Sequence, residues 1–302
     1  MHGRPPATAY VAAVGMTVAF GISFVVTKEA LRGFHPLLLA LVRFTLAGGV
    51  LWGLWRLRRR RGRATRADLL RLAALGLVSL TLYFALEING LARTTASAAA
   101  ILMATIPIFV SVLAALLLHE RSGARQWLGV ALSFLGVAGL MGLGSEVGGG
   151  GLSGDALILG AALCAAVYNL MARRLLVRRS ALYVTAYQNL FGALFMAPLA
   201  LAEALLVGVR KPASGALIGV LYLALGCSLL GFLLLNYAFR FIPASRVSIF
   251  VNATPVVGVA AAYVVLGERF TAAQLVAAAV VIAGVWLANS GARSAVRSPS
   301  GG

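Results

Sequence analysis

One stretch of this chain occurs twice, and the second copy lies 148 positions after the first. Residues 96–140 predict an apolar helix, a short turn and a second apolar helix, and residues 244–288 repeat that order. With this offset and no gap, Pro107 falls on Pro255 and the pair Glu120-Arg121 falls on Glu268-Arg269. Shared apolar composition alone would not align a proline and a charged pair. We therefore expect two related halves.

The apolar content places the chain in a lipid bilayer. Of its 302 residues 61% are hydrophobic and only 11% are charged, and the mean hydropathy is +0.95. A spanning helix takes about 20 residues, so about ten spans would leave only short connections and no room for a large soluble domain. We therefore predict an all-α integral membrane protein with ten transmembrane helices, arranged as two inverted five-helix repeats.

The apolar runs divide the chain into four parts. We expect a first five-helix repeat in residues 1–145, a Gly-rich linker in 146–155, a second repeat in 156–290 and a disordered tail in 291–302. The linker lacks the Gly-Lys-Ser/Thr sequence of a phosphate-binding loop. The first apolar run is expected to be a span, because no small-residue cleavage site of a signal peptide follows it.

The basic residues predict the orientation. The net charge of +18 comes from short runs between apolar segments, which argues against a nucleic-acid partner. If the N-terminus is cytoplasmic, nineteen of the 26 Lys and Arg residues lie inside, six lie outside, and Arg43 lies within a helix. This bias favours two cytoplasmic termini. Because five is an odd number, the second half would cross the membrane in the opposite direction to the first.

Two similar halves of opposite orientation can form a central cavity that opens to either face in turn. A secondary transporter with a small-molecule substrate is therefore the favoured function. We expect no enzyme, because the sequence shows no set of catalytic residues, and we expect no cofactor, no metal site and no ATP-binding loop. Transport against a gradient would need a coupling ion such as a proton. A membrane scaffold or sensor, or a membrane-embedded enzyme, remains as an alternative.

These features resemble the EamA branch of the drug/metabolite transporter superfamily. The resemblance rests on the five-plus-five helices, Ala-Ser near the start of the fourth and ninth helices, the two prolines and the Glu-Arg turns followed by a Gln-Gly helix, and it covers about residues 10–289. It implies ten helices, a central cavity and, for most members, export across the inner membrane of a bacterium. Members move amino acids, purines, drugs and other metabolites, so the resemblance gives no substrate.

Polar groups at membrane depth are the candidates for a substrate site, because a buried charge is costly unless it has a partner or faces water. Arg43 lies about seven residues, or ~10 Å, from one end of the second helix, and Glu87 lies at a similar depth in the third. Arg43 would hold a carboxylate, and Glu87 an amine or a proton. The alternative is a structural ion pair between the two helices. The other residues expected around the cavity are Tyr83, Tyr168, Gln188, Asn236 and Asn252.

Several of these residues also have structural interpretations. The tyrosines and amides can serve in packing or in hydrogen bonds between helices. Pro107 and Pro255 can bend their helices for gating or for static packing. By local alignment of the halves, Arg43 falls on Gln188. The two Glu-Arg pairs are expected to fix helix turns, and small residues in the fourth, fifth, ninth and tenth helices allow close packing within the monomer or in a homodimer.

Overall fold

The computed structural model describes residues 6–57, 65–118, 123–144, 151–176, 179–212, 214–242, 244–269 and 271–295. In these ranges every regular element is helical. The elements are α1 (Ala7–Ala30), α2 (Pro36–Leu57), α3 (Arg66–Gly76), η1 (Leu77–Leu82), α4 (Tyr83–Leu91), α5 (Ala96–Met103), α6 (Ile106–Leu118), α7 (Ala124–Gly144), α8 (Leu152–Leu176), α9 (Ala181–Val207), α10 (Ser214–Leu221), η2 (Tyr222–Gly231), α11 (Phe232–Phe241), α12 (Ala244–Ala261), η3 (Ala262–Leu266) and α13 (Ala272–Ala295). The three η elements are π-helical.

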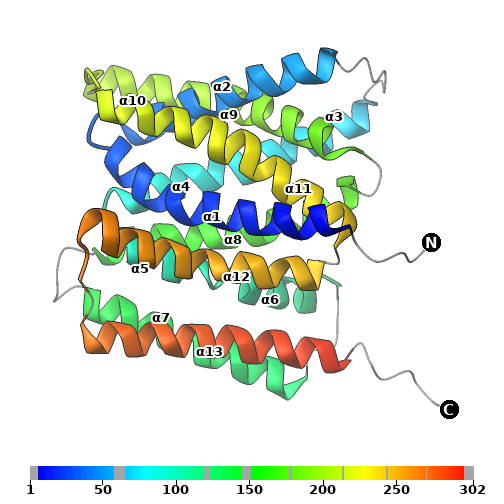
Figure 1. Cartoon of the computed structure of the whole chain (residues 1–302), viewed down its shortest axis with the longest axis vertical. Helices are drawn as coiled ribbons and strands as arrows, with labels where there is room; N and C mark the ends of the chain where they lie inside the picture. Colours follow the sequence, from blue (N-terminus) through cyan, green and yellow to red (C-terminus); the bar gives the residue numbers. More distant parts are fainter. Residues whose placement is uncertain are drawn as a thin grey trace.

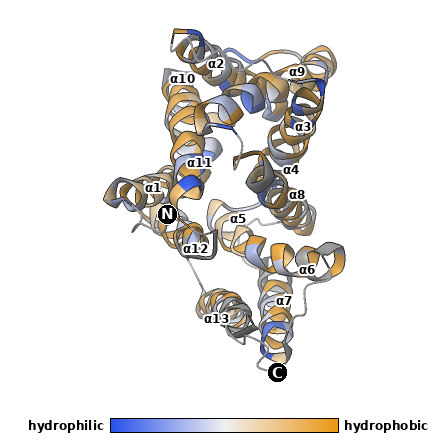
Figure 2. Ribbon diagram, turned by 90° about the vertical axis from the view of Figure 1, so that its right-hand side faces the viewer, coloured by the Kyte–Doolittle hydropathy of each residue, from blue (hydrophilic) through white to orange (hydrophobic). Residues whose placement is uncertain are grey.

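Within the described residues, seven helices or continuous helix runs are long and apolar enough to cross a membrane. They cover residues 7–30, 36–57, 66–91, 96–113, 152–172, 181–207 and 214–241. Two shorter apolar helices, Ala253–Leu266 and Ala272–Ala288, follow near the end of the chain. Large apolar side chains are exposed on many of these helices, and hydrophobic residues occur along all of the helix ribbons (Figure 2). A lipid environment suits such a surface, and the predicted all-helical membrane class is confirmed.

Local sequence signals set where several helices begin. The Thr65 hydroxyl accepts a hydrogen bond from the backbone N–H of Asp68 at 3.2 Å and caps α3. At α13, Thr271 N–H donates to the Gln274 side chain at 3.1 Å, and Gln274 N–H donates to the Thr271 hydroxyl at 3.2 Å. This reciprocal pair is a capping box. After α9, Gly208 takes a φ of 82°, which a residue with a Cβ rarely adopts.

The structure corrects three predicted features. The helix expected to bend in its middle at Pro107 is broken into α5 and α6, and Pro107 is the second residue of α6. Proline suits that place because the first turn of a helix leaves its N–H groups without helical partners. The linker ends earlier than predicted, since α8 begins at Leu152. Residues 291–295 of the predicted tail continue α13, whereas the rest of the tail lies outside the described residues.

The helices lie side by side along one direction, and α1 begins at the same end of the bundle at which α13 ends (Figure 1). Viewed along the helices, α1, α4, α5, α8, α11 and α12 surround a central region, while α7 and α13 form a separate pair (Figure 2). Lys28, near the end of α1, donates to the Leu91 carbonyl at 2.8 Å. The ends of α1 and α4 therefore lie at the same end of the bundle.

Glycines bring α7 and α13 into close antiparallel contact. A Cβ on Gly129 would lie 2.6 Å from the Gly284 carbonyl oxygen, and one on Gly136 would lie 2.7 Å from Val281 N. Between these contacts, the Ser133 hydroxyl donates to the Val281 carbonyl at 3.0 Å. Residues 133 and 281 are themselves 148 positions apart. The predicted close approach of these helices is therefore found within the monomer.

Candidate substrate cavity

A cavity with a volume of about 120 Å³ lies among the central helices. Residues from both halves of the chain line it. They are Phe20, Ser23 and Phe24 of α1, Arg43 of α2, Ser79 of η1, Tyr83, Phe84 and Glu87 of α4, Met103 of α5, Ile106 of α6, Ala165, Tyr168 and Asn169 of α8, Phe232 and Leu235 of α11, and Val251, Thr254 and Pro255 of α12. The wall is thus mostly apolar and aromatic, with a few polar groups that face one space.

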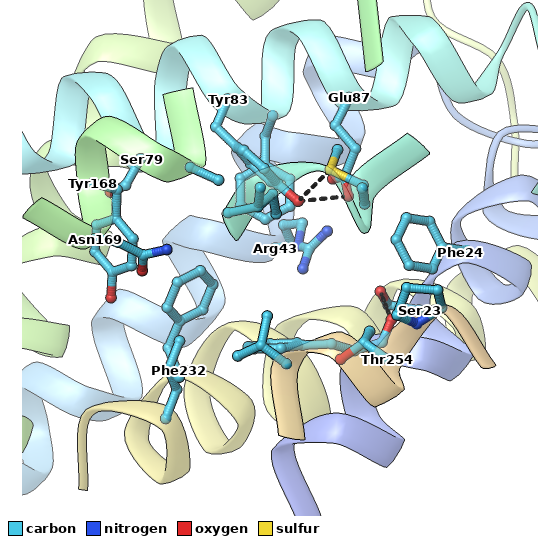
Figure 3. A pocket seen from close by; sticks show the side chains of 18 residues that line it. Ser23, Phe24, Arg43, Ser79, Tyr83, Glu87, Tyr168, Asn169, Phe232 and Thr254 are labelled. Atoms are coloured by element: carbon cyan, nitrogen blue, oxygen red, sulfur yellow. Dashed lines mark hydrogen bonds between the residues drawn. The ribbon is translucent and has the colours of Figure 1, made fainter. Parts of the chain in front are cut away.

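Arg43 is the buried cation of this wall, with only 2% of its surface exposed. Its Nε donates to the Ser228 hydroxyl at 2.9 Å. The guanidinium carbon lies 4.5 Å from the ring centre of Phe84 and 5.5 Å from that of Phe44. These contacts hold the planar group in one orientation. Among the described residues the two terminal nitrogens make no hydrogen bond, and Figure 3 shows them pointing into the cavity.

Glu87 is the buried carboxylate of the same wall and is 5% exposed. It accepts a hydrogen bond from the Tyr83 hydroxyl at 2.9 Å, one helical turn earlier on α4 (Figure 3). Tyr83 also lies 3.9 Å from the sulfur of Met103. The ion pairs of the described residues do not include one between Arg43 and Glu87. Two opposite charges therefore face one cavity without neutralising each other directly.

The other predicted site residues divide into two groups. Tyr83 and Tyr168 line the cavity, as does the backbone-bending Pro255. Gln188 and Asn236 are fully buried behind the wall. The Asn236 side chain accepts from the Tyr168 hydroxyl at 3.3 Å and supports that wall residue.

The side chain of Asn252 lies outside the described part of the structure, as do Glu120 and Arg121. Pro107 does not line the cavity itself, although its neighbours Met103 and Ile106 do.

Sequence reasoning missed several small polar groups of the wall, namely Ser23, Ser79, Asn169 and Thr254. The Thr254 hydroxyl oxygen is buried and makes no hydrogen bond within the described residues. It faces Arg43 and Glu87 across the cavity (Figure 3). Its position directly before Pro255 and the position of Asn169 directly after Tyr168 were the available signals. Among the described residues, no group of three His, Cys, Asp or Glu side chains that could hold a metal occurs.

Two π-helical segments carry serines that each accept a hydrogen bond from the other half of the chain. Ser79 of η1 accepts from Gln188 Nε2 at 2.8 Å, and Ser228 of η2 accepts from Arg43 Nε at 2.9 Å. Shifted by 148 positions, η1 falls within η2. π-Helical turns are rare and frequently occur at functional sites. The two segments therefore make similar polar contacts, although the serines stand one position apart in the repeat, because Ser79 falls on Cys227.

One end of the bundle is tied by a carboxylate that caps a helix of the other half. Glu268, which follows η3, accepts hydrogen bonds from the backbone N–H groups of Ala96 at 3.0 Å and Ser97 at 3.1 Å, and from the Ser97 hydroxyl. A carboxylate at a helix N-terminus satisfies free N–H groups and complements the helix dipole. Glu268 thus does more than fix its own turn, because it joins two segments 172 positions apart.

Comparison with known proteins decides the family. A sequence model of the EamA-like transporter family matches residues 7–142 and again residues 152–290. The chain belongs to the EamA-like transporter family. This confirms the resemblance seen in the sequence, and it makes the chain a multi-pass membrane protein of a family of transporters, which are not enzymes.

Curated relatives of this EamA-like protein carry transporter names. An uncharacterized transporter, YcxC of Bacillus subtilis (strain 168), is 30% identical over 99% of this chain and 97% of its own length. A probable terminal-alkyne amino-acid exporter of Streptantibioticus cattleyicolor is also 30% identical, over 90% of each chain. A solved crystal structure covers 98% of this chain with a TM-score of 0.66 and 20% identity, which shows that the two share a fold.

Proposed function

We propose that this protein is a secondary transporter that exports small amino-acid-like metabolites, or other polar or amphipathic compounds that bear a carboxylate. The observation that carries the proposal is one cavity with a buried Arg43 and a buried Glu87 that do not pair with each other. In a poorly solvated site each charge is stabilised by an opposite charge. A zwitterion brings both, with its carboxylate on Arg43 and its amine on Glu87.

The size and lining of the cavity agree with a small ligand. A volume of about 120 Å³ leaves room for several water molecules. The rings of Phe20, Phe24, Phe84 and Phe232 surround it and suit an apolar side chain. The printed name of the Streptantibioticus relative, an amino-acid exporter, supports the same class of substrate.

Alternating access between two inverted five-helix repeats is the proposed mechanism, with ten transmembrane helices in all. The two family matches, the corresponding places of η1 and η2, and the antiparallel contact of α7 with α13 support it. The two repeats would lie within residues 1–145 and 152–290, since α8 opens the second repeat at Leu152. We place the protein in a bacterial inner membrane with both termini in the cytoplasm, surrounded by lipid.

Proton coupling through Glu87 and assembly as a homodimer complete the proposal. A carboxyl group can release a proton when an amine binds and take it up again when the amine leaves. Glu87 is the carboxyl group in the described cavity wall, so it is the residue through which such an exchange would pass.

Flux measurements in proteoliposomes test the function. Purified protein is first screened by thermal stabilisation against a panel of L-amino acids and their carboxamides, because a ligand that binds the folded state raises its stability. Efflux of the stabilising compounds is then measured for wild type, Arg43→Ala and Glu87→Gln. The matched controls are Arg32→Ala and Glu29→Gln, which remove the same two charges from an exposed ion pair at the end of α1.

The proposal predicts flux in wild type and in both controls, and at least about a tenfold loss in both cavity variants. Wild-type flux in Arg43→Ala and Glu87→Gln at normal membrane levels would make the site assignment wrong. Absence of any flux would favour a scaffold or sensor. Product formation that does not depend on vesicle sidedness would favour a membrane enzyme.

A further inference from the structure

The position of Arg43 depends on a residue from the other half of the chain. Ser228 is fully buried in η2 and does not line the cavity, yet its hydroxyl is the hydrogen-bond partner of Arg43 Nε at 2.9 Å. A guanidinium has five N–H donors in a rigid fork. Use of the Nε–H by Ser228, behind the wall, leaves the four N–H donors of the terminal nitrogens for the cavity.

The orientation of the fork decides what Arg43 can bind. Arginine binds a carboxylate through two parallel N–H···O bonds, and this geometry requires the edge of the guanidinium to face the ligand. Contacts with Phe84 and Phe44 fix the plane of the group, but they leave it free to turn within that plane. The Ser228 contact removes this freedom, because it anchors one edge of the guanidinium against η2.

A similar hydrogen bond between a buried serine and a long polar side chain links the two halves of the chain a second time. Gln188, at the place in α9 that corresponds to Arg43 in α2, donates to Ser79 of η1 at 2.8 Å. Ser79 is 3% exposed and Ser228 is 0% exposed. Each half therefore supplies a serine to a long polar side chain of the other, and the pair containing Ser228 is the one that holds a charge.

We infer that Ser228 is a positioning residue that orients the Arg43 guanidinium for carboxylate binding. The inference rests on the proposed function, and it names Ser228 as the residue that sets the preference for a carboxylic acid over its amide. It has a consequence for transport, because Arg43 lies in the first half and Ser228 in the second. A relative movement of α2 and η2 that lengthens this hydrogen bond weakens the grip on the carboxylate, so acid binding and the relative position of the halves are linked.

The test must separate positioning from a purely structural role. Loss of the Ser228 hydroxyl leaves a buried donor of Arg43 without a partner, so Ser228→Ala lowers stability in either case. The informative readout is the ratio of affinities for an acid and its amide, measured by thermal stabilisation of the full-length protein in detergent. The probes are L-amino acids paired with their carboxamides, which differ only at the carboxylate.

Three variants complete the experiment. Ser228→Ala is expected to lower the acid-to-amide ratio at least about tenfold, and Ser228→Thr, which keeps a hydroxyl, is expected to restore most of it. Ser133→Ala is the matched control, since it removes a buried serine hydroxyl from the contact of α7 with α13, away from the cavity and from Arg43, and it is expected to keep the wild-type ratio. If Ser228→Ala does not fold, Ser228→Cys takes its place, because it keeps the volume and offers only a weak acceptor.

The outcomes are distinct. A wild-type ratio in Ser228→Ala or Ser228→Cys overturns the positioning role while the proposed function stands. An equal loss in Ser133→Ala also overturns it, because the effect would then come from general loosening of the bundle. A wild-type protein that binds acids and amides equally, or binds neither, contradicts the proposed carboxylate recognition itself.

Discussion

At the scale of single residues, the cavity depends on how two buried charges are held. Arg43 is oriented by a serine and two aromatic rings, and Glu87 by the hydroxyl of Tyr83. Neither is paired with the other among the described ion pairs. Both charged groups are therefore free to bind a ligand. Their burial without a charged partner destabilises the empty protein, and a bound zwitterion would stabilise both.

The Tyr83 hydroxyl should matter more than that of Tyr168. Tyr83→Phe leaves the buried Glu87 carboxylate without its described hydrogen bond, so we expect a loss of about 1–3 kcal/mol in the free energy of unfolding. Tyr168→Phe removes a neutral bond to Asn236 and should cost about 1 kcal/mol. Thermal unfolding in detergent measures both. A larger loss for Tyr168→Phe than for Tyr83→Phe would contradict this order.

The charged residues of the site could be predicted from the sequence, whereas its serine and threonine residues could not. Arg43 and Glu87 stand out because charges are rare in apolar spans. Ser228, Ser79 and Thr254 do not stand out, since serine and threonine are common in membrane helices and hydrogen-bond to their own backbone. Which of them faces a cavity or a partner depends on the packing of helices distant in sequence, and a single chain does not show that.

At the scale of elements, helix ends followed their sequence signals, while breaks and π-helices did not. The cap at Thr65 and the capping box at Thr271 were readable because the partners are three residues apart. Pro107 marked a disturbance but not its form, since proline suits both a kink and a first turn. The π-helices η1 and η2 have no local signature, and they become apparent only through the helices packed against them.

The Glu268 cap should stabilise α5 across the two halves. Glu268→Ala removes the acceptor of the N–H groups of Ala96 and Ser97, so we expect a loss of about 0.5–2 kcal/mol in the free energy of unfolding. Glu268→Gln should lose less, because one amide oxygen can still accept. Glu29→Ala, at an exposed ion pair at the end of α1, should have no measurable effect. Equal unfolding midpoints for Glu268→Ala and Glu29→Ala would refute the cap.

The contact between α7 and α13 should tolerate added methyl groups at one glycine of α7 and not at another. A Cβ on Gly129 would lie 2.2 Å from the backbone nitrogen of Ala288, whereas one on Gly139 would lie 3.7 Å from the nearest atom, Ala277 Cβ. Gly129→Ala should therefore cost about 1–3 kcal/mol through forced separation of the helices. Gly139→Ala should be neutral or slightly stabilising, because alanine favours the helix. Denaturation in detergent compares the two variants.

At the scale of the whole molecule, the all-helical membrane class was readable from the sequence, while the arrangement of the helices needed the structure. Run length and hydropathy predicted spanning helices, and the offset of 148 places η1 within η2. The end of the bundle that Glu268 ties was not readable, because its partner lies 172 positions away. Boundaries next to Gly-rich or polar segments, such as the start of α8, were the least predictable.

Inverted topology predicts opposite locations for the two Glu-Arg turns. Tags inserted after Arg121 and after Arg269 should be accessible from opposite faces of the membrane, with the first in the cytoplasm. Protease protection and impermeant thiol labelling in intact cells measure this. Accessibility of both tags from the same face would contradict the inverted orientation of the two repeats.

The central claim is that one cavity opens to either face of the membrane in turn, and labelling of a single cysteine in its wall tests that claim directly. Cys164 and Cys227 are first replaced, and Ser23, which lines the cavity, becomes the only cysteine. Vesicles of both orientations are then treated with an impermeant maleimide. Alternating access predicts that Ser23→Cys reacts with the maleimide from both faces, and that a transported amino acid slows both reactions. Reaction from one face alone under every condition would contradict it.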